Sequence, residues 1–196
     1  MSSQQTFQSR RRRMDDEYQE LVQEIRAGDT RAFESVFRHY QPRLFRFLWH
    51  LVRSSEVAED LVQSLFLNIW KNRKQWHVNS SLTTYLYRAA KNAALNYLRS
   101  RTAHSAVCAD LDHLPDNETR PDQDYDQKEL RVLVQQAIDS LPPGCRTVFV
   151  LSRYENLKYQ DIAEVLDISV KTVENQMGRA LRLLRQKLTP FLKLTK

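Results

Sequence analysis

An acidic, proline-containing stretch near the middle of the chain limits what its 196 residues can form. Between residues 101 and 126 there are two arginines against seven aspartates and glutamates, together with Pro115 and Pro121 and few large apolar side chains. A segment of this composition cannot bury enough apolar surface to offset the entropy of ordering its backbone. We therefore predict an acidic flexible linker over 102–126 that joins two separate domains.

Both flanking parts of the chain have helical patterns. Apolar residues recur three and four positions apart, no convincing period-two alternation occurs, and only three glycines are present. Val148–Leu151 fits a short strand, but its flanks favour a buried helix. The predicted fold class is all-α, with two small helical domains over 15–101 and 127–196, after a basic tail at 1–14 that we expect to be disordered. The expected helices cover 15–28, 30–52 (interrupted or kinked by Pro42), 55–74, 81–100, 127–140, 144–153, 159–166 and 170–188 (closed by Pro190).

Several function classes are disfavoured by what the sequence lacks. Cys108 and Cys145 are far apart and have no neighbouring ligands at metal-site spacing, and the five histidines form no ligand pair. The glycines form no phosphate-binding cluster. A metal-dependent nuclease needs clustered carboxylates, and residues 61–109 contain none. With no long apolar run and no secretory signal, we expect a cytoplasmic protein that is not an enzyme and uses neither metal nor cofactor.

The charge distribution favours a nucleic acid as partner. The net charge is +6, and residues 61–109 carry seven lysines and arginines interleaved with tryptophans and tyrosines. Cations hold a phosphate backbone and aromatic rings stack on bases, so this pattern is typical of a nucleic-acid surface. The alternative is a solvated helix face with aromatic residues in the core. The run Arg10–Arg13 fits either a DNA contact or a solubilising tail.

Residues 159–188 predict a helix-turn-helix. A short helix with Ile162 and Ala163 precedes the turn Asp167-Ile168-Ser169, where Asp167 stands at a position that is often glycine. Ser169 is a good N-cap for the longer helix that follows. That helix has one apolar face, and its other face carries the candidate residues for reading a major groove: Lys171, Thr172, Glu174, Asn175, Gly178, Arg179 and Arg182.

These motifs resemble a known family. The stretch from Leu141 to Leu188, with Tyr159–Glu164 and Ile168–Val173, resembles the fourth conserved region of bacterial sigma-70-type factors. Ala58–Phe66 resembles the second region of the short extracytoplasmic-function group, and Tyr85–Asn92 resembles its promoter-melting helix. The resemblance implies an alternative sigma factor that binds core RNA polymerase, recognises the -35 and -10 promoter elements and helps to melt the duplex.

The resemblance also implies roles for residues of the first domain. Asp60, Gln63 and Phe66 would bind the clamp coiled coil of the polymerase β′ subunit, although Ser64 replaces the usual glutamate. The flap of the β subunit is a further implied contact. The melted -10 strand would be held by Trp76, Arg88, Asn92 and Asn96. Each of these residues also fits a purely structural role.

Two further implications concern partners and alternatives. Factors of this group are commonly held inactive by an anti-sigma factor, often one anchored in the membrane, and they have no small-molecule substrate. The alternative function is a helix-turn-helix transcriptional regulator that does not replace the housekeeping sigma factor. Such a regulator usually has an upstream receiver or ligand-binding domain, and the helical pattern of this chain does not predict one.

Overall fold

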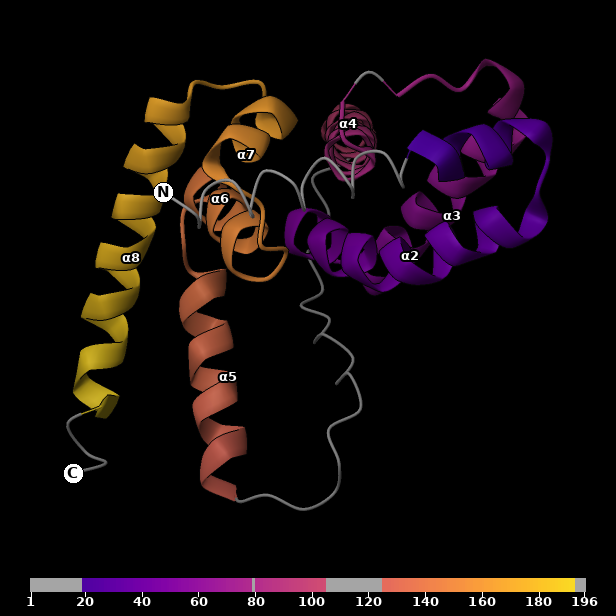
Figure 1. The fold of residues 1–196 in the computed structure, drawn as a ribbon. Coiled ribbons are helices and arrows are strands. Elements are labelled where there is room, and N and C mark those ends of the chain that lie inside the picture. Colours follow the sequence, from indigo (N-terminus) through magenta and orange to yellow (C-terminus); the bar gives the residue numbers. More distant parts are fainter. Residues whose placement is uncertain (1–18, 79, 105–124, 193–196) are drawn as a thin grey trace. The chain divides into compact units, whose positions relative to one another are not determined.

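The computed structural model describes residues 19–78, 80–104 and 125–192 (Figure 1). The regular structure within these residues is entirely helical, which confirms the predicted fold class. The chain divides into two compact units, the first made of Met1–Leu48 and Glu56–Val107, and the second of Trp49–Ser55 and Cys108–Lys196. Arg10–Arg13, Cys108 and most of the acidic segment lie outside the described residues. None of the helices in the described ranges is long and apolar enough to cross a bilayer.

The first unit is built around three long helices. Residues 19–27 are helical, and Gly28, at φ +96°, separates them from α2 (Thr30–Val52). Helix α3 (Ser55–Lys71) follows, then a 3-10 turn η1 (Arg73–Gln75) and α4 (Leu82–His104). Asp29 caps α2, because its Oδ1 accepts hydrogen bonds from the backbone N–H groups of Arg31 (2.7 Å) and Ala32 (3.2 Å).

Helices α2 and α4 pack through large buried side chains. The rings of Phe47 and Tyr87 lie edge to face at 5.2 Å, and both side chains are fully buried. The hydroxyl of Tyr40 is 2.7 Å from Thr83 Oγ1, which satisfies a polar group in a position that is otherwise apolar. This packing fixes which side of α4 can face a ligand.

Two prolines lie inside helices: α2 is not interrupted at Pro42, where the sequence predicted an interruption or a kink, and α8 (Val170–Leu192) does not end before Pro190, where the sequence predicted its end. A proline removes one backbone hydrogen bond from a helix. Pro42 is exposed, so water can satisfy the carbonyl group freed there. Pro190 lies near the end of α8, which continues only two residues beyond it.

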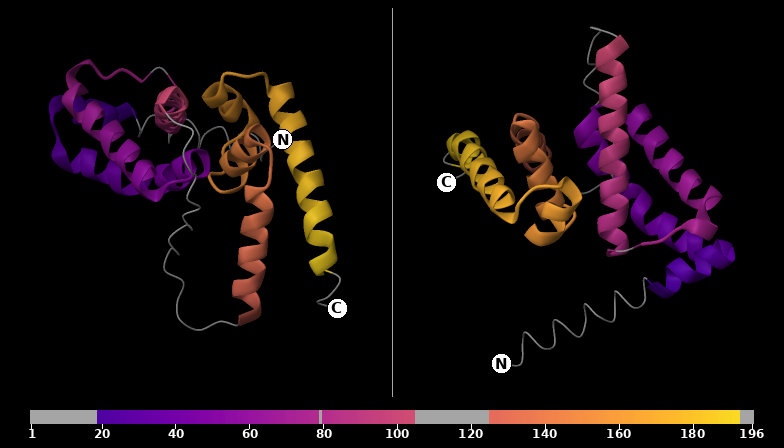
Figure 2. Two further views of the ribbon diagram at one scale, coloured as in Figure 1. Left: turned by 180° about the vertical axis from the view of Figure 1, so that it is seen from behind. Right: turned by 90° about the horizontal axis from the view of Figure 1, so that it is seen from above.

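In the second unit, α8 packs against α5 (Tyr125–Asp139), α6 (Pro143–Arg153) and α7 (Tyr159–Leu166), as two views show (Figures 1 and 2). Gly144 in α6 allows close packing, because a Cβ there would lie 3.1 Å from the side-chain nitrogen of Gln176. The buried residues shared by α5, α6 and α8 form one core: Ala137, Ile138, Leu141, Cys145, Ala180 and Leu184.

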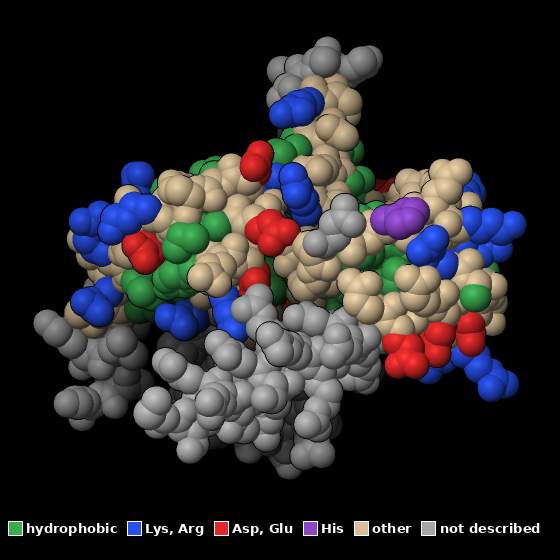
Figure 3. Space-filling model, turned by 45° about the horizontal axis from the view of Figure 1, so that its top comes forward, with side chains coloured by type: hydrophobic (Ala, Val, Ile, Leu, Met, Phe, Trp, Pro, Cys, Tyr) green, Lys and Arg blue, Asp and Glu red, His purple; other side chains and the backbone are tan. Residues whose placement is uncertain are grey.

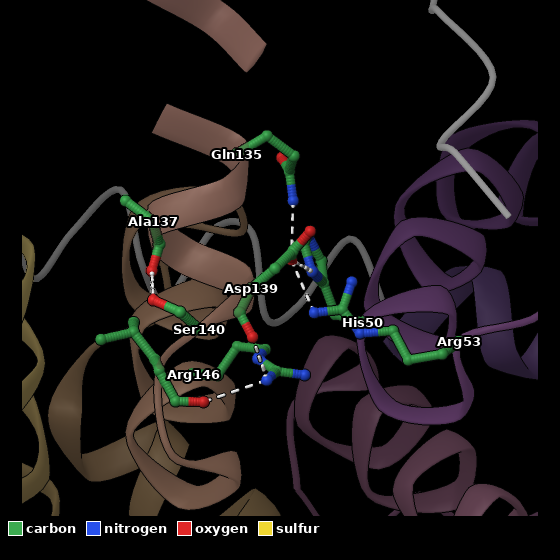
Figure 4. Close-up of polar contacts among 8 residues, drawn as sticks. His50, Arg53, Gln135, Ala137, Asp139, Ser140 and Arg146 are labelled. Carbon is green, nitrogen blue, oxygen red and sulfur yellow. Dashed lines mark hydrogen bonds and ion pairs between the residues drawn. The ribbon is translucent and has the colours of Figure 1, made fainter. Parts of the chain in front are cut away.

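Polar contacts fix the corner between α5 and α6 (Figure 4). Nη2 of Arg146 donates to the carbonyl oxygens of Asp139 and Leu141, which lack helical partners at the end of α5. The Asp139 carboxylate accepts hydrogen bonds from Arg53 Nη2 (2.6 Å) and Gln135 Nε2 (2.9 Å). Burial and the neighbouring Arg53 lower the pKa of Arg146, and Asp139 opposes this shift. These contacts orient the start of α6, on which α7 and α8 pack.

Candidate nucleic-acid interface

A left-handed residue makes the turn between α7 and α8. Asp167 has φ 59° and ψ 48°, the left-handed conformation that glycine adopts most readily, at the position where many such turns have glycine. The N–H groups of Asp167 and Ile168 both donate to the carbonyl oxygen of Ala163. These bonds end α7 and let the chain reverse into α8 within three residues.

Ser169 caps the N-terminus of α8. Its Oγ accepts a hydrogen bond from the backbone N–H of Thr172 (3.0 Å) and lies 2.8 Å from the Thr172 hydroxyl. The cap fixes the first turn of the helix, where side chains of a helix-turn-helix reach base edges. It also holds Thr172, one of the predicted DNA-binding residues, in a defined position.

Burial separates α8 into two faces. Val173, Met177 and Ala180 are at most 2% exposed and lie against α5, α6 and α7. The predicted DNA-binding residues lie on the opposite side, all exposed except Thr172, which is half-buried: Lys171, Thr172, Glu174, Asn175, Gly178, Arg179 and Arg182. The structure therefore brings the whole predicted set together on one solvent-facing surface, the α8 face.

The α8 face carries mixed polar chemistry and open space. Lys171 Nζ lies 3.3 Å from a carboxylate oxygen of Glu174, and both side chains are exposed. An exposed ion pair contributes little free energy, so either side chain can leave it to bind another partner. A Cβ added at Gly178 would meet nothing within 4 Å, so packing in the unit does not require glycine there. On the side of the molecule drawn in Figure 3, Lys and Arg side chains stand beside exposed apolar ones.

In the first unit, α4 presents a stripe of polar side chains. Arg88, Asn92 and Asn96 are spaced four residues apart and are exposed, so they share one face. Trp76, predicted to act with them, is only 5% exposed, and its ring packs 5.8 Å from that of Tyr85. Tyr87 is fully buried. Here the basic stretch uses these aromatic rings to pack its core, and the assigned DNA contact of Trp76 stays a prediction.

The residues predicted to bind polymerase lie on α3. Asp60 and Gln63 are exposed, whereas Phe66 is 3% exposed and packs edge to face against Phe37 at 4.9 Å. Leu67 is 56% exposed although it is large and apolar. Sequence reasoning gave Leu67 no role, because a single leucine beside the apolar positions of a helix carries no signal of its own.

Two family models match the chain. Residues 36–104 match the family described as Sigma-70 region 2, and residues 131–184 match Sigma-70, region 4. All of the predicted site residues fall within these two spans. The RNA polymerase sigma-H factor of Pseudomonas aeruginosa is 30% identical over 184 residues, covering 89% of this chain and 95% of that protein. The ECF RNA polymerase sigma-E factor of Haemophilus influenzae is 31% identical, with 89% and 96% covered.

Solved structures have the same fold. CnrH, in complex with the cytosolic domain of CnrY, matches with a TM-score of 0.61 and 22% identity over 91% of this chain and 99% of that one. The sigma factor RpoE of Bartonella quintana, in complex with the anti-sigma factor NepR, matches with a TM-score of 0.62 and 20% identity, covering 80% and 96%. At this identity the likeness concerns the fold alone.

The left-handed turn generates a stability prediction. Asp167→Ala should lower the free energy of unfolding by about 1 kcal/mol, because alanine adopts this conformation less readily than aspartate. Asp167→Gly should leave it unchanged or raise it slightly. Denaturant unfolding at constant m-value measures both, with Gln160→Ala as an exposed control on α7. A glycine variant less stable than the alanine variant would contradict the role of backbone strain.

Proposed function

Since the chain belongs to the extracytoplasmic-function group of the sigma-70 family, we propose that its two units divide promoter recognition between them. The protein is an alternative sigma factor that binds core RNA polymerase and recognises promoter DNA to start transcription. Members of the family are non-enzymatic initiation factors. We extend this to the chain itself, which acts in the cytoplasm and leaves all chemistry to the polymerase.

The α8 face recognises the -35 element. One observation supports this assignment most directly: the α8 face is exposed, whereas Val173, Met177 and Ala180 on the opposite side of the helix are at most 2% exposed. Its side chains suit base edges in a major groove, since Lys and Arg pair with guanine, Asn with adenine and Glu with cytosine. Arg182, further along the helix, suits phosphate. The open surface at Gly178 lets the backbone of α8 approach the duplex closely.

The exposed stripe of α4 holds the melted -10 strand. Arg88 attracts the phosphate backbone, and the amides of Asn92 and Asn96 offer both donors and acceptors to an unstacked base. Residues 61–109 include no carboxylate that would repel the strand. Trp76 acts in the same region, either by supporting the stripe through its contact with Tyr85 or by direct stacking after it moves.

Helix α3 docks on the clamp coiled coil of the polymerase β′ subunit, and the second unit contacts the β flap. Asp60 and Gln63 supply the exposed polar contacts, while Phe66 shapes the surface from beneath. We further propose that an anti-sigma factor, anchored in the membrane, holds the chain inactive. The structures of CnrH with CnrY and of RpoE with NepR support this, because those proteins have the same fold.

The experiment that tests the whole assignment is run-off transcription with purified core polymerase. The chain should associate with the polymerase and give a defined start site without the housekeeping factor. A helix-turn-helix regulator would bind DNA but would not replace that factor. Transcription that requires the housekeeping factor would therefore favour this alternative.

Arg179→Ala should weaken binding to a -35 duplex by about 1–3 kcal/mol and relax the preference at one base position. The guanidinium is exposed on the α8 face, so its removal leaves the core intact. Fluorescence anisotropy with the native duplex and single-base variants measures both effects. Arg153→Ala, an exposed arginine at the end of α6, is the matched control. Equal affinity of the Arg179 variant for every duplex would remove its assigned role.

Gly178→Ala should separate stability from DNA binding. Alanine is favoured over glycine inside a helix by about 1 kcal/mol, and the space around Gly178 is open, so the second unit should become more stable. Affinity for the -35 duplex should fall, because the added methyl group stands between α8 and the DNA. Thermal unfolding and anisotropy on the same sample measure the two effects. Unchanged affinity would show that the backbone stays away from the duplex at this position.

Asn92→Ala should reduce selectivity for the -10 sequence and leave polymerase affinity unchanged, because the amide is exposed on α4 and not on α3. Binding of the holoenzyme to fork-junction templates with altered -10 bases measures selectivity. Gln23→Ala, an exposed amide of the first unit, is the control. A parallel loss of polymerase affinity would instead place Asn92 in the docking surface or the scaffold.

A further inference from the structure

The side chain of Gln176 lies between the α8 face and the core of the second unit. It follows Thr172 by four residues and precedes Arg179 by three, so it neighbours both on the surface of the helix. Both of these residues belong to the α8 face, whereas Gln176 is half-buried. It is neither one of the buried residues of the core nor one of the residues assigned to the -35 element.

The amide of Gln176 is folded back against α6. A Cβ added at Gly144 would lie 3.1 Å from its Nε2 and 3.3 Å from its Cδ and its Oε1. The amide therefore occupies the space that a side chain at residue 144 would fill. Gly144 is exposed and stands in the first turn of α6, so the missing side chain leaves a seat at the surface of the unit, the Gly144 seat.

In the Gly144 seat the amide is not fully satisfied. Its Oε1 is buried and has no hydrogen-bond partner among the described residues. A buried acceptor without a partner costs free energy, which water or another donor would recover. The side chain is long and flexible, so a change of rotamer carries the amide away from Gly144 without moving the helix. The seat therefore holds the amide weakly.

We propose that Gln176 is a further base-reading residue, stored in the Gly144 seat in the free protein and turned outward when a duplex lies on the α8 face. The inference rests on the proposed recognition of the -35 element by that face. Turned outward, the amide stands beside Thr172 and Arg179 and offers a donor and an acceptor, the pair that matches N7 and N6 of adenine. The base then supplies the partner that Oε1 lacks in the seat, and rotamer changes of this kind are common on binding.

Gln176→Met separates reading from packing, because methionine keeps the length and bulk of the side chain but has no amide. The full chain with this change should lose a preference for adenine at one position of the -35 duplex, by about fivefold or more. Gln176→Glu should move the preference at that position toward cytosine, whose amino group donates to a carboxylate. Fluorescence anisotropy with duplexes varied one base pair at a time measures both. Gln136→Met, at an exposed glutamine of α5, is the matched control and should keep every preference.

Gly144→Ala tests the storage of the amide. The added methyl group crowds the seat, so the affinity for the adenine-containing duplex should rise about twofold or more. In the Gln176→Met background the same change should have no effect on affinity, and this double-mutant cycle isolates the pair. An equal rise in both backgrounds would show that the methyl group acts in another way and would overturn the storage.

Arg179→Ala distinguishes failure of this inference from failure of the proposed function. If Arg179→Ala weakens binding while Gln176→Met keeps every base preference, the α8 face reads the duplex and the Gln176 amide only packs, which overturns the inference alone. If neither variant alters binding, the assignment of the -35 element to α8 fails as well. Circular dichroism confirms that each variant is folded.

Discussion

The α8 face, which we propose reads the -35 element, depends on the burial of the opposite side of α8. Val173, Met177 and Ala180 are at most 2% exposed, and a helix repeats its faces every 3.6 residues. Fixing these three therefore fixes the direction of every other side chain on α8. A rotation that exposed Met177 would carry Arg179 toward apolar surroundings, where an unpaired charge costs several kcal/mol. The buried contacts that stabilise the unit therefore also set the direction in which the α8 face points.

The first unit buries its aromatic residues less completely, because a groove between α2 and α3 remains open at its surface. Phe33, Phe66 and Trp70 pack against one another at tilted angles, as aromatic rings prefer, and such packing leaves a hollow that aliphatic side chains would fill. Phe66 belongs both to the core and to the wall of this groove, so its removal would lower the stability of the unit. Leu67 lines the same groove but is 56% exposed, so it contributes less to the core.

Much of this arrangement could be predicted from the sequence because strong local signals determine it. The period of apolar residues fixed α7 and the start of α8, and the preference of aspartate for left-handed backbone predicted the conformation at Asp167. Asp29 and Ser169 stand where their side chains cap helices. These features depend on residues within one or two turns of each other, which is the range over which a sequence pattern is informative.

Other features depend on tertiary context and could not be predicted in this way. Pro42 could not be recognised as tolerated inside α2, since that depends on whether its freed carbonyl faces water. Within α4, packing on α2 buries Tyr87, Ala90 and Ala94, which the apolar period of the sequence does not distinguish from their neighbours. The ring of Trp76 is buried because Tyr85 offers it a partner, although its basic neighbours suggested a nucleic-acid contact.

Separate cores also explain how modest surfaces can act together on one promoter. Because each unit buries its own apolar residues, each can hold its contacts without the other, and covalent connection makes the second binding event intramolecular. Effective concentrations in the millimolar range then raise the combined affinity by about 10² to 10⁴ over a single contact. A loss of about 1.4 kcal/mol at either surface still costs tenfold in the assembled complex. If the two units divide recognition as proposed, selectivity for a promoter requires both elements to match, although neither surface needs to bind tightly alone.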